Sequence, residues 1–227
     1  MNGINYGIAM LATIKRYIRA AISFIRNEKS KRLINLRHEK SKGNIDRLLR
    51  KNNPIFLEVG AGNKRGNNGW ITLDMTENCD MFWDLRKGIP FPDESISKVY
   101  SSHFLEHLSF REGQVFLKEC LRVLVPGGIF SICVPNSRIY IEAYYLNKTL
   151  DPNQFFAYKP AFNNTTKIDY INHIAYMDGE HKYMFDEDNL TCILKQSGFQ
   201  NVRLRKFDSN IDLESRDLNS IYAEAEK

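Results

Sequence analysis

A short apolar segment that ends in a glycine turn constrains the fold of this chain more than any other feature. Residues 55–59 read Ile-Phe-Leu-Glu-Val, and Gly60-Ala61-Gly62 follows at once. Apolar runs of this length are typical of strands that are buried on both faces of a parallel sheet. Glycine at the end of such a strand allows a sharp turn and a close approach of the backbone to a ligand. The segment therefore predicts a buried parallel strand followed by a ligand-binding turn.

Further apolar runs alternate with helix signals along the rest of the chain. Strands are expected over residues 70–74, 81–84, 97–102, 129–134, 202–207 and 221–224. Ser109 and Glu112 have the pattern of a capping box, which predicts a helix that ends before Pro126-Gly127-Gly128. More helices are expected over residues 137–147 and 186–195. This alternation predicts an α/β fold with a mostly parallel sheet and helices on both faces.

Length, cysteine spacing and charge restrict the class of protein. The 227 residues suffice for one domain with an appendage, and we divide them into an extension over residues 1–52 and a domain over residues 53–227. The four cysteines form no C-x-x-C pair, which is typical of free thiols in a reducing, cytoplasmic compartment. Residues 1–50 carry 12 Lys and Arg against 3 Asp and Glu, whereas residues 51–227 carry 20 against 24. The acidic balance of the domain argues against a nucleic-acid partner.

The basic extension has the pattern of an amphipathic helix over residues 4–26. Its apolar stripe recurs at intervals of three and four residues and consists of Met10, Leu11, Ile14, Ile18, Ala21, Ile22 and Ile25. Lys15 and Arg19 lie on the opposite stripe, and a second helix is expected over residues 27–51. One interpretation packs the apolar stripe on the domain or on a second subunit of a homodimer. The other places residues 1–26 on the inner face of a membrane as a peripheral contact with anionic lipid.

Four segments of the domain occur in an order and at a spacing that are typical of one enzyme family. They are residues 57–62, 84–95, 101–108 and 121–128. Together they resemble the class I S-adenosylmethionine-dependent methyltransferases over about residues 54–136, which implies a Rossmann-like sheet, S-adenosyl-L-methionine as cofactor and enzymatic methyl transfer. Only eight residues separate Gly62 from Ile71, so the first crossover is expected to be shortened. Lys64 and Arg65 in this loop are expected either to be solvated or to replace a missing helix terminus at the carboxylate of the cofactor.

The resemblance also implies a set of cofactor-binding residues. They are Glu58, Gly60, Ala61, Gly62, Asp74, Met75, Asp84, Leu85, Ser102 and His103. In this assignment Glu58 and the glycines line the methionine end of the cofactor, and Asp74 accepts hydrogen bonds from the ribose hydroxyls. Met75 packs on the adenine, Asp84 accepts from its amino group, and the residues after the fourth strand close over the sulfonium.

Histidines are the candidate catalytic bases. A sulfonium methyl is transferred by in-line displacement, so the protein mainly aligns the acceptor and removes its proton. Histidine suits this role because its pKa lies near neutrality, and the candidates are His103, His107 and His181. His103 and His107 follow the fourth strand, at the edge where α/β sheets bind ligands. Glu106 is expected to orient a neighbouring imidazole or to cap the next turn.

The segment from His103 to His107 also has the H-x-x-E-H form of a zinc-peptidase site. That site needs a long helix, whereas this segment lies at a strand exit. Some methyltransferases that resemble this chain bind a divalent metal here through two acids and a histidine. Because His103 replaces the first acid, no metal is expected.

These residues predict methyl transfer to a hydroxyl group of a sugar, a glycan or a small metabolite. The short loops resemble those of small bacterial methyltransferases associated with surface-polysaccharide biosynthesis. An aromatic-rich insertion or lid is expected over about residues 148–185, with rings that stack on the acceptor or pack on the domain. A cofactor-binding scaffold without activity, or methylation of a protein or amine acceptor, remains an alternative. A nicotinamide oxidoreductase is disfavoured because Arg65 stands where the third glycine of its motif belongs.

Overall fold

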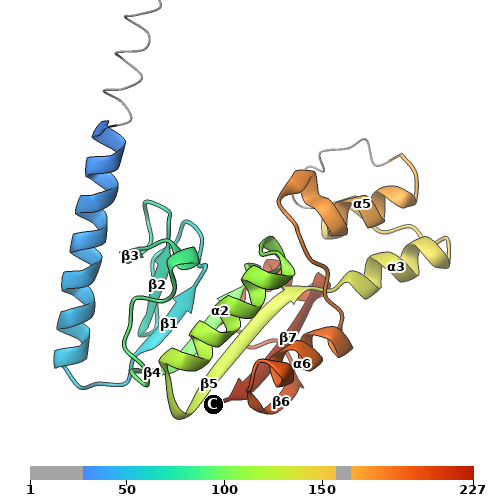
Figure 1. Cartoon of the computed structure of the whole chain (residues 1–227). Helices are drawn as coiled ribbons and strands as arrows, with labels where there is room; N and C mark the ends of the chain where they lie inside the picture. Colours follow the sequence, from blue (N-terminus) through green and yellow to red (C-terminus); the bar gives the residue numbers. More distant parts are fainter. Residues whose placement is uncertain (1–27, 157–164) are drawn as a thin grey trace, which may run out of the picture.

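The computed structural model describes residues 28–156 and 165–227. Within them, a seven-stranded sheet has the order β3-β2-β1-β4-β5-β7-β6 (Figure 1). Its strands are β1 (Phe56–Val59), β2 (Trp70–Asp74), β3 (Met81–Phe82), β4 (Ile96–Ser102), β5 (Leu124–Pro135), β6 (Gln200–Arg205) and β7 (Ser220–Glu226). Strand β7 is antiparallel to both of its neighbours, and the pairings among β1 to β5 are parallel. The predicted Rossmann-like α/β fold with a mostly parallel sheet is confirmed.

The direction of the strand order reverses at β1. The chain passes from β1 outward to β2 and β3, and then returns to the other side of β1 as β4. Phe56 of β1 is therefore in register with Trp70 on one side and with Lys98 on the other. Open α/β sheets bind ligands outside the carboxyl ends of the strands at such a switch point. The turn at residues 60–62 lies at this point.

Helices and short 3-10 turns connect the strands. The helices are residues 28–50, α2 (Phe110–Val123), α3 (Ser137–Tyr145), α4 (Pro152–Phe155), α5 (Ile168–Tyr176) and α6 (Glu187–Gln196). The turns are η1 (Leu85–Lys87), η2 (Leu105–His107), η3 (Met177–Gly179) and η4 (Glu214–Asn219). The predicted capping box opens α2, with Ser109 as the N-cap and Glu112 as its partner. Asp186 caps α6, as the sequence predicts.

One face of the sheet carries the main hydrophobic core. Helices α2 and α6 lie over this face (Figure 1) and bury Phe116 and Leu190 in the core. Ile45 of the helix over residues 28–50 joins the same cluster. On the other face, Phe207 and Ile211 pack on a smaller cluster that includes Tyr100. The loop over residues 206–213 thus packs on this cluster.

The first crossover is short, as the sequence predicts. The chain between β1 and β2 contains no helix. Asp80 holds this loop, because its Oδ2 accepts hydrogen bonds from Gly66 N at 2.9 Å and from Thr72 N at 3.0 Å. In the absence of a crossover helix, the Asp80 side chain beyond β2 thus fixes the position of the loop.

Strand β5 is longer than predicted. It begins at Leu124, where α2 ends, and includes Pro126-Gly127-Gly128, which the sequence analysis placed outside the strand. Leu124 is in register with Ile96, and the register then shifts before the next pair. The strand therefore continues through the proline and glycines with an irregular register. From the sequence alone, these residues indicate the end of a regular element.

The segment that was expected to be an aromatic-rich insertion or lid contains helices. Helices α4 and α5 fall inside residues 148–185, and α5 packs against α3. Tyr140, Phe156 and Tyr170 form the buried centre of this second cluster. Its aromatic spacing reflects packing between helices at the end of the sheet (Figure 1).

The amphipathic helix predicted over residues 4–26 lies outside the described residues, whereas the helix predicted over residues 27–51 is present from residue 28 to residue 50. Among the described residues, no helix is long and apolar enough to cross a membrane.

Candidate active site

A hydrogen bond joins the turn after β1 to the acid at the end of β2. Gly62 N donates to Asp74 Oδ2 at 2.9 Å. Gly60 and Gly62 have φ angles of 68° and 67°, which residues with a Cβ rarely adopt. Ala61 is half-buried between them. The glycine turn and the acid, which the sequence analysis singled out separately, therefore form one unit at the carboxyl edge of the sheet.

Phe104 encloses this turn from the exit of β4. A Cβ atom at Gly60 would lie 2.2 Å from the Phe104 ring, so this position has no room for a side chain. The ring also packs on Phe116 of α2, with ring centroids 5.1 Å apart. The sequence analysis missed Phe104, although it lies directly after His103 in one of the segments that carry the resemblance.

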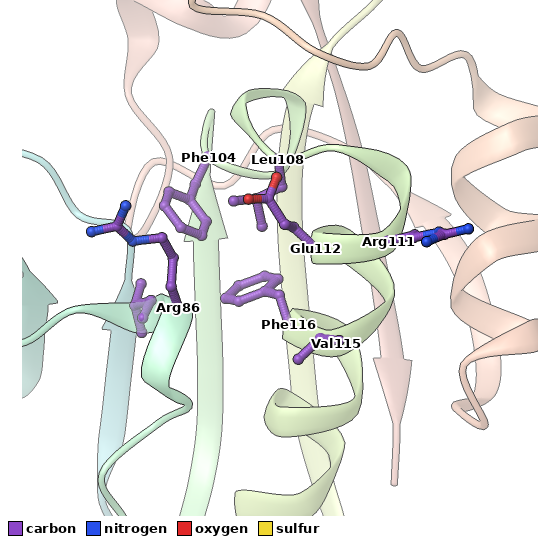
Figure 2. A pocket seen from close by; sticks show the side chains of 8 residues that line it. Arg86, Phe104, Leu108, Arg111, Glu112, Val115 and Phe116 are labelled. Atoms are coloured by element: carbon purple, nitrogen blue, oxygen red, sulfur yellow. The ribbon is translucent and has the colours of Figure 1, made fainter.

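Two adjoining cavities form a groove between η1, Phe104 and α2. One has a volume of about 350 Å³, and Figure 2 shows Phe104, Leu108 and Phe116 along it, while Arg111 points away. The second has a volume of about 270 Å³ and shares Phe104 and Leu108 with the first. The predicted site residues that line this groove are Asp74, Met75, Asp84, Leu85 and His107.

Asp84 caps η1 and holds Arg86 at the mouth of the groove. Its Oδ1 accepts from Arg86 N at 3.1 Å and from Arg86 Nε at 2.8 Å, and its Oδ2 accepts from Arg86 Nη2 at 2.9 Å. These hydrogen bonds lower the pKa of Asp84, so its carboxylate is charged at neutral pH. A ligand that bonds to Asp84 must share it with Arg86, a residue that the sequence analysis missed.

Glu58 lies in a different cavity. This cavity has a volume of about 250 Å³ and is also lined by Trp70 and Tyr100. Lys64 Nζ lies 2.6 Å from Glu58 Oε1, so Lys64 is not a solvated loop charge. Burial raises the pKa of Glu58, and the contact with Lys64 offsets part of that rise. The structure therefore separates Glu58 from the predicted site residues in the groove.

Ser102 is buried beside a cation from the C-terminal part of the chain. Its Oγ accepts a hydrogen bond from Arg216 Nη1 at 3.1 Å. Arg216 belongs to η4 and has no motif around it, so no sequence signal points to this contact.

The three candidate bases gather around one carboxylate. We name His103, Glu106, His107 and His181 the histidine cluster. Both His103 Nδ1 and His107 Nε2 lie 3.7 Å from Glu106 Oε1, and the rings of His107 and His181 are 5.1 Å apart between centroids. Of the three histidines, His107 lines the groove.

Burial governs protonation in this cluster. It lowers the pKa of His103 to about 3, and it raises the pKa of Glu106, whose side chain is 2% exposed, to about 8. Burial also lowers the pKa of His181. His103 and His181 are therefore neutral imidazoles beside a carboxyl group that resists ionisation. His103 directly follows β4, and Glu106 and His107 belong to η2, so these three residues are close in the sequence. His181 joins them from much further along the chain, which no spacing in the sequence predicts.

Comparison with known proteins addresses the region between β2 and β5. Residues 79–132 match the family model described as a methyltransferase domain. A probable S-adenosylmethionine-dependent methyltransferase of Mycolicibacterium smegmatis is 42% identical over 57 residues, which are 23% of this chain and 21% of that protein. The match thus spans about a fifth of the length of this relative. Both findings support the predicted class, an S-adenosylmethionine-dependent methyltransferase, and its cofactor.

Solved methyltransferase structures are also similar to the chain. One from Archaeoglobus fulgidus, described as S-adenosylmethionine-dependent, has 19% identity and a TM-score of 0.44 over 84% of this chain and 94% of its own. Phosphoethanolamine N-methyltransferase 2 of Haemonchus contortus, solved with S-adenosyl-L-methionine, has 11% identity and a TM-score of 0.46 over 77% of this chain and 48% of its own. At these identities and TM-scores, the similarity does not assign the activity of either protein to this chain.

Proposed function

We propose that the chain is an S-adenosylmethionine-dependent methyltransferase that holds its cofactor in the groove. The observation that carries this proposal is the convergence of Asp74, Met75, Asp84 and Leu85 on one groove at the carboxyl ends of β2 and β3. The match of residues 79–132 to a methyltransferase domain supports it. The cavity volumes of about 350 and 270 Å³ suit a ligand of nucleoside size, since ligand pockets start at about 300 Å³.

The groove offers the contacts that an adenosine group needs. Asp74 is half-buried, and each of its oxygens has a second lone pair beyond the backbone bond it already accepts. Those lone pairs suit the two ribose hydroxyls. The apolar side chains of Met75 and Leu85 suit the faces of the adenine, and Phe104 limits the groove toward Gly60. The cofactor, when bound, supplies a methyl group that is activated by the positive sulfur.

We assign a hydroxyl compound as the acceptor of the methyl group. We assign His107 as the base that takes up the proton of that hydroxyl. This histidine lines the groove, and its side chain is 35% exposed, so a substrate can reach it. Its Nδ1 lies 2.9 Å from the Glu180 carbonyl oxygen, which can only accept, so Nδ1 carries the proton and Nε2 is free to take one. His103 is a weaker candidate because burial lowers its pKa to about 3.

A sugar, a glycan or a small metabolite is the acceptor class that we propose. An enzyme of surface-polysaccharide biosynthesis that works in the cytoplasm near the membrane fits this class, with residues 1–26 as the contact to lipid or to a second subunit.

Calorimetry and mass spectrometry test the proposal. The full chain should bind S-adenosylmethionine and its demethylated product with micromolar affinity, and should add 14 Da (roughly one methyl group in place of hydrogen) to a member of a panel of hydroxyl acceptors. His107→Gln should lower turnover by about 10²–10⁴ while cofactor affinity is retained. A folded chain that releases no heat with either ligand contradicts the assignment, and binding without transfer across the panel favours the scaffold alternative.

A further inference from the structure

Three imidazole nitrogens that carry no proton lie in the histidine cluster. His107 donates from Nδ1 to the Glu180 carbonyl, and His181 lies with Nδ1 2.8 Å from the Ile174 carbonyl oxygen. A carbonyl oxygen cannot donate, so both imidazoles carry their proton on Nδ1. Their Nε2 atoms therefore present lone pairs, and His107 Nε2 faces Glu106 Oε1 at 3.7 Å.

His103 has the opposite tautomer and presents its lone pair to the same carboxylate. Ser220 Oγ donates its proton to the Arg216 carbonyl at 2.6 Å, so it must accept from His103 Nε2 at 2.8 Å. His103 Nδ1 is then unprotonated and lies 3.7 Å from Glu106 Oε1. Two backbone carbonyls and one serine thus orient three imidazoles so that each points a lone pair inward.

Glu106 completes this arrangement as a buried carboxyl group to which none of these imidazoles donates. Its side chain is 2% exposed, and neither of its oxygens has a hydrogen-bond partner among the described residues. Buried polar groups are almost always satisfied, and leaving one unpaired costs free energy. A cation that replaces the carboxyl proton and binds the Nε2 atoms of His107 and His181 would pair Glu106 with both of these imidazoles.

We propose that Glu106, His107 and His181 bind a divalent transition-metal ion. Their ligand atoms lie within 4.8 Å of one another. Zn²⁺ takes imidazole nitrogen and carboxylate oxygen at about 2.0–2.2 Å in tetrahedral geometry, which separates two ligands by roughly 3.4 Å, so a modest contraction of the cluster closes the site. Two histidines and one carboxylate leave a fourth position open, as in catalytic zinc sites.

The surroundings of the three ligands match those of a metal site. Metal-bound histidines usually donate their second nitrogen to a carbonyl or a carboxylate, and both histidines do so here. The backbone also fixes the ligands, because Glu106 O accepts from Lys182 N at 2.8 Å and from Tyr183 N at 3.2 Å. These bonds hold His181 beside η2, although 74 positions separate it from His107 in the sequence.

This site reverses the expectation of no metal, which rested on His103 replacing an acid. The missing ligand comes instead from His181, which the sequence places far away. Because His107 also lines the groove, an ion here would coordinate an acceptor hydroxyl and lower its pKa. The hydroxyl proton would then pass to solvent, which reaches the 35% exposed His107 side chain, and His107 would act as a ligand rather than as the base. This last step rests on the proposed function, whereas binding of the ion does not.

Metal titration of the full chain tests the proposal. After chelator treatment and dialysis, Zn²⁺ is titrated by calorimetry and Co²⁺ by its visible absorption, which reports coordination by nitrogen. The chain should bind one ion. Glu106→Gln keeps the shape of the side chain but removes its charge, and His181→Gln removes a ligand. Each should weaken binding by at least about 100-fold, since loss of outer contacts alone costs 10–100-fold. His38→Gln, remote from the cluster, should bind as the unsubstituted chain does.

Two results would overturn the metal site. The first is a folded chain that takes up neither ion at millimolar concentration. The second is equal affinity in the unsubstituted chain, Glu106→Gln and His181→Gln, with circular dichroism confirming that each is folded. Binding of S-adenosylmethionine in the presence of chelator is measured in parallel. That measurement addresses the proposed function alone, so failure of one proposal is distinguished from failure of the other.

Discussion

Lys64 reaches back across the glycine turn to Glu58, and the two form an ion pair with 2.6 Å between Nζ and Oε1. Glu58 is buried on β1, whereas the Lys64 side chain is 35% exposed. The pair links the loop of the shortened crossover to the strand that starts it. The loop is thus held from both ends, by Lys64 on Glu58 and by Asp80 on Gly66 and Thr72.

Lys64→Met should destabilise the fold, because it leaves the Glu58 carboxylate buried without its cation. Removing one partner of a fully buried pair costs about 3–5 kcal/mol, and the partial exposure of Lys64 reduces this to about 1–2 kcal/mol. Urea unfolding measures the change. Glu58→Gln combined with Lys64→Met should recover most of the loss, and Lys64→Arg should be close to neutral. Equal stability of Lys64→Met and the unsubstituted chain would show that the pair is solvated in solution.

Asp74→Asn should weaken binding of S-adenosylmethionine by at least tenfold, or about 1.4 kcal/mol. The amide keeps one acceptor oxygen for Gly62 N, but it loses the charge and a lone-pair set that the ribose hydroxyls need. Calorimetry with the cofactor and with its demethylated product measures the loss. Asp188→Asn is the matched control, because the Asp188 side chain is 93% exposed and lies outside the groove. Unchanged affinity in Asp74→Asn would place the ribose elsewhere.

Gly60→Ala should be more destabilising than Gly62→Ala. Both positions have positive φ, which costs a residue with a Cβ about 1–2 kcal/mol. Only Gly60 also faces the Phe104 ring, at 2.2 Å from the added atom, and that overlap adds about 1–3 kcal/mol. A Cβ at Gly62 meets nothing within 4 Å.

Urea unfolding of the two variants gives the difference directly. Phe104→Ala combined with Gly60→Ala should remove most of the extra cost, because the overlapping ring is gone. The expected coupling between Gly60 and Phe104 is absent if the effects of the two substitutions simply add.

Strands and helix caps that depend on neighbouring residues could be predicted from the sequence. Contacts in the site between residues far apart in the sequence could not. Strand β2 has the predicted bounds, and the capping box of α2 is present because Ser109 and Glu112 need only each other. The start of β5 was wrong, because its pairing with Ile96 overrides the proline and glycines inside it. A local sequence pattern indicates the backbone preference of a segment. Where that preference and the pairing with a neighbouring strand differ, the pairing determines the structure.

The same distinction holds within the site. The strand-end positions of Gly62 and Asp74 follow from the strand pattern, and the structure joins them by a hydrogen bond. Nothing in the sequence brings His181 to His107 or Arg216 to Ser102, because these contacts depend on how the segments after β5 return to the sheet. The candidate bases could thus be chosen by residue type, but the position of His181 beside Glu106 and His107 could not be predicted.

The capping box at the start of α2 gives a pH-dependent prediction, because Glu112 lines the groove while it bonds to Ser109. Hydrogen bonds with Ser109 lower the pKa of Glu112 from 4.5 to about 2. A carboxyl group with a lowered pKa in the folded state stabilises the fold above its unfolded pKa, and this contribution is lost as the pH falls from about 4.5 through about 2.

Ser109→Ala should therefore raise the pKa of Glu112 toward 4.5, as measured by the NMR titration of its side-chain carboxyl carbon. Lys182→Met should raise the pKa by less, because Lys182 approaches Glu112 only to 3.4 Å and contributes less than Ser109 does. Far-UV circular dichroism should show the acid loss of α2 moving to higher pH in Ser109→Ala. The reverse order of the two variants would mean that the ion pair with Lys182, rather than the capping box, holds the charge of Glu112 in the groove.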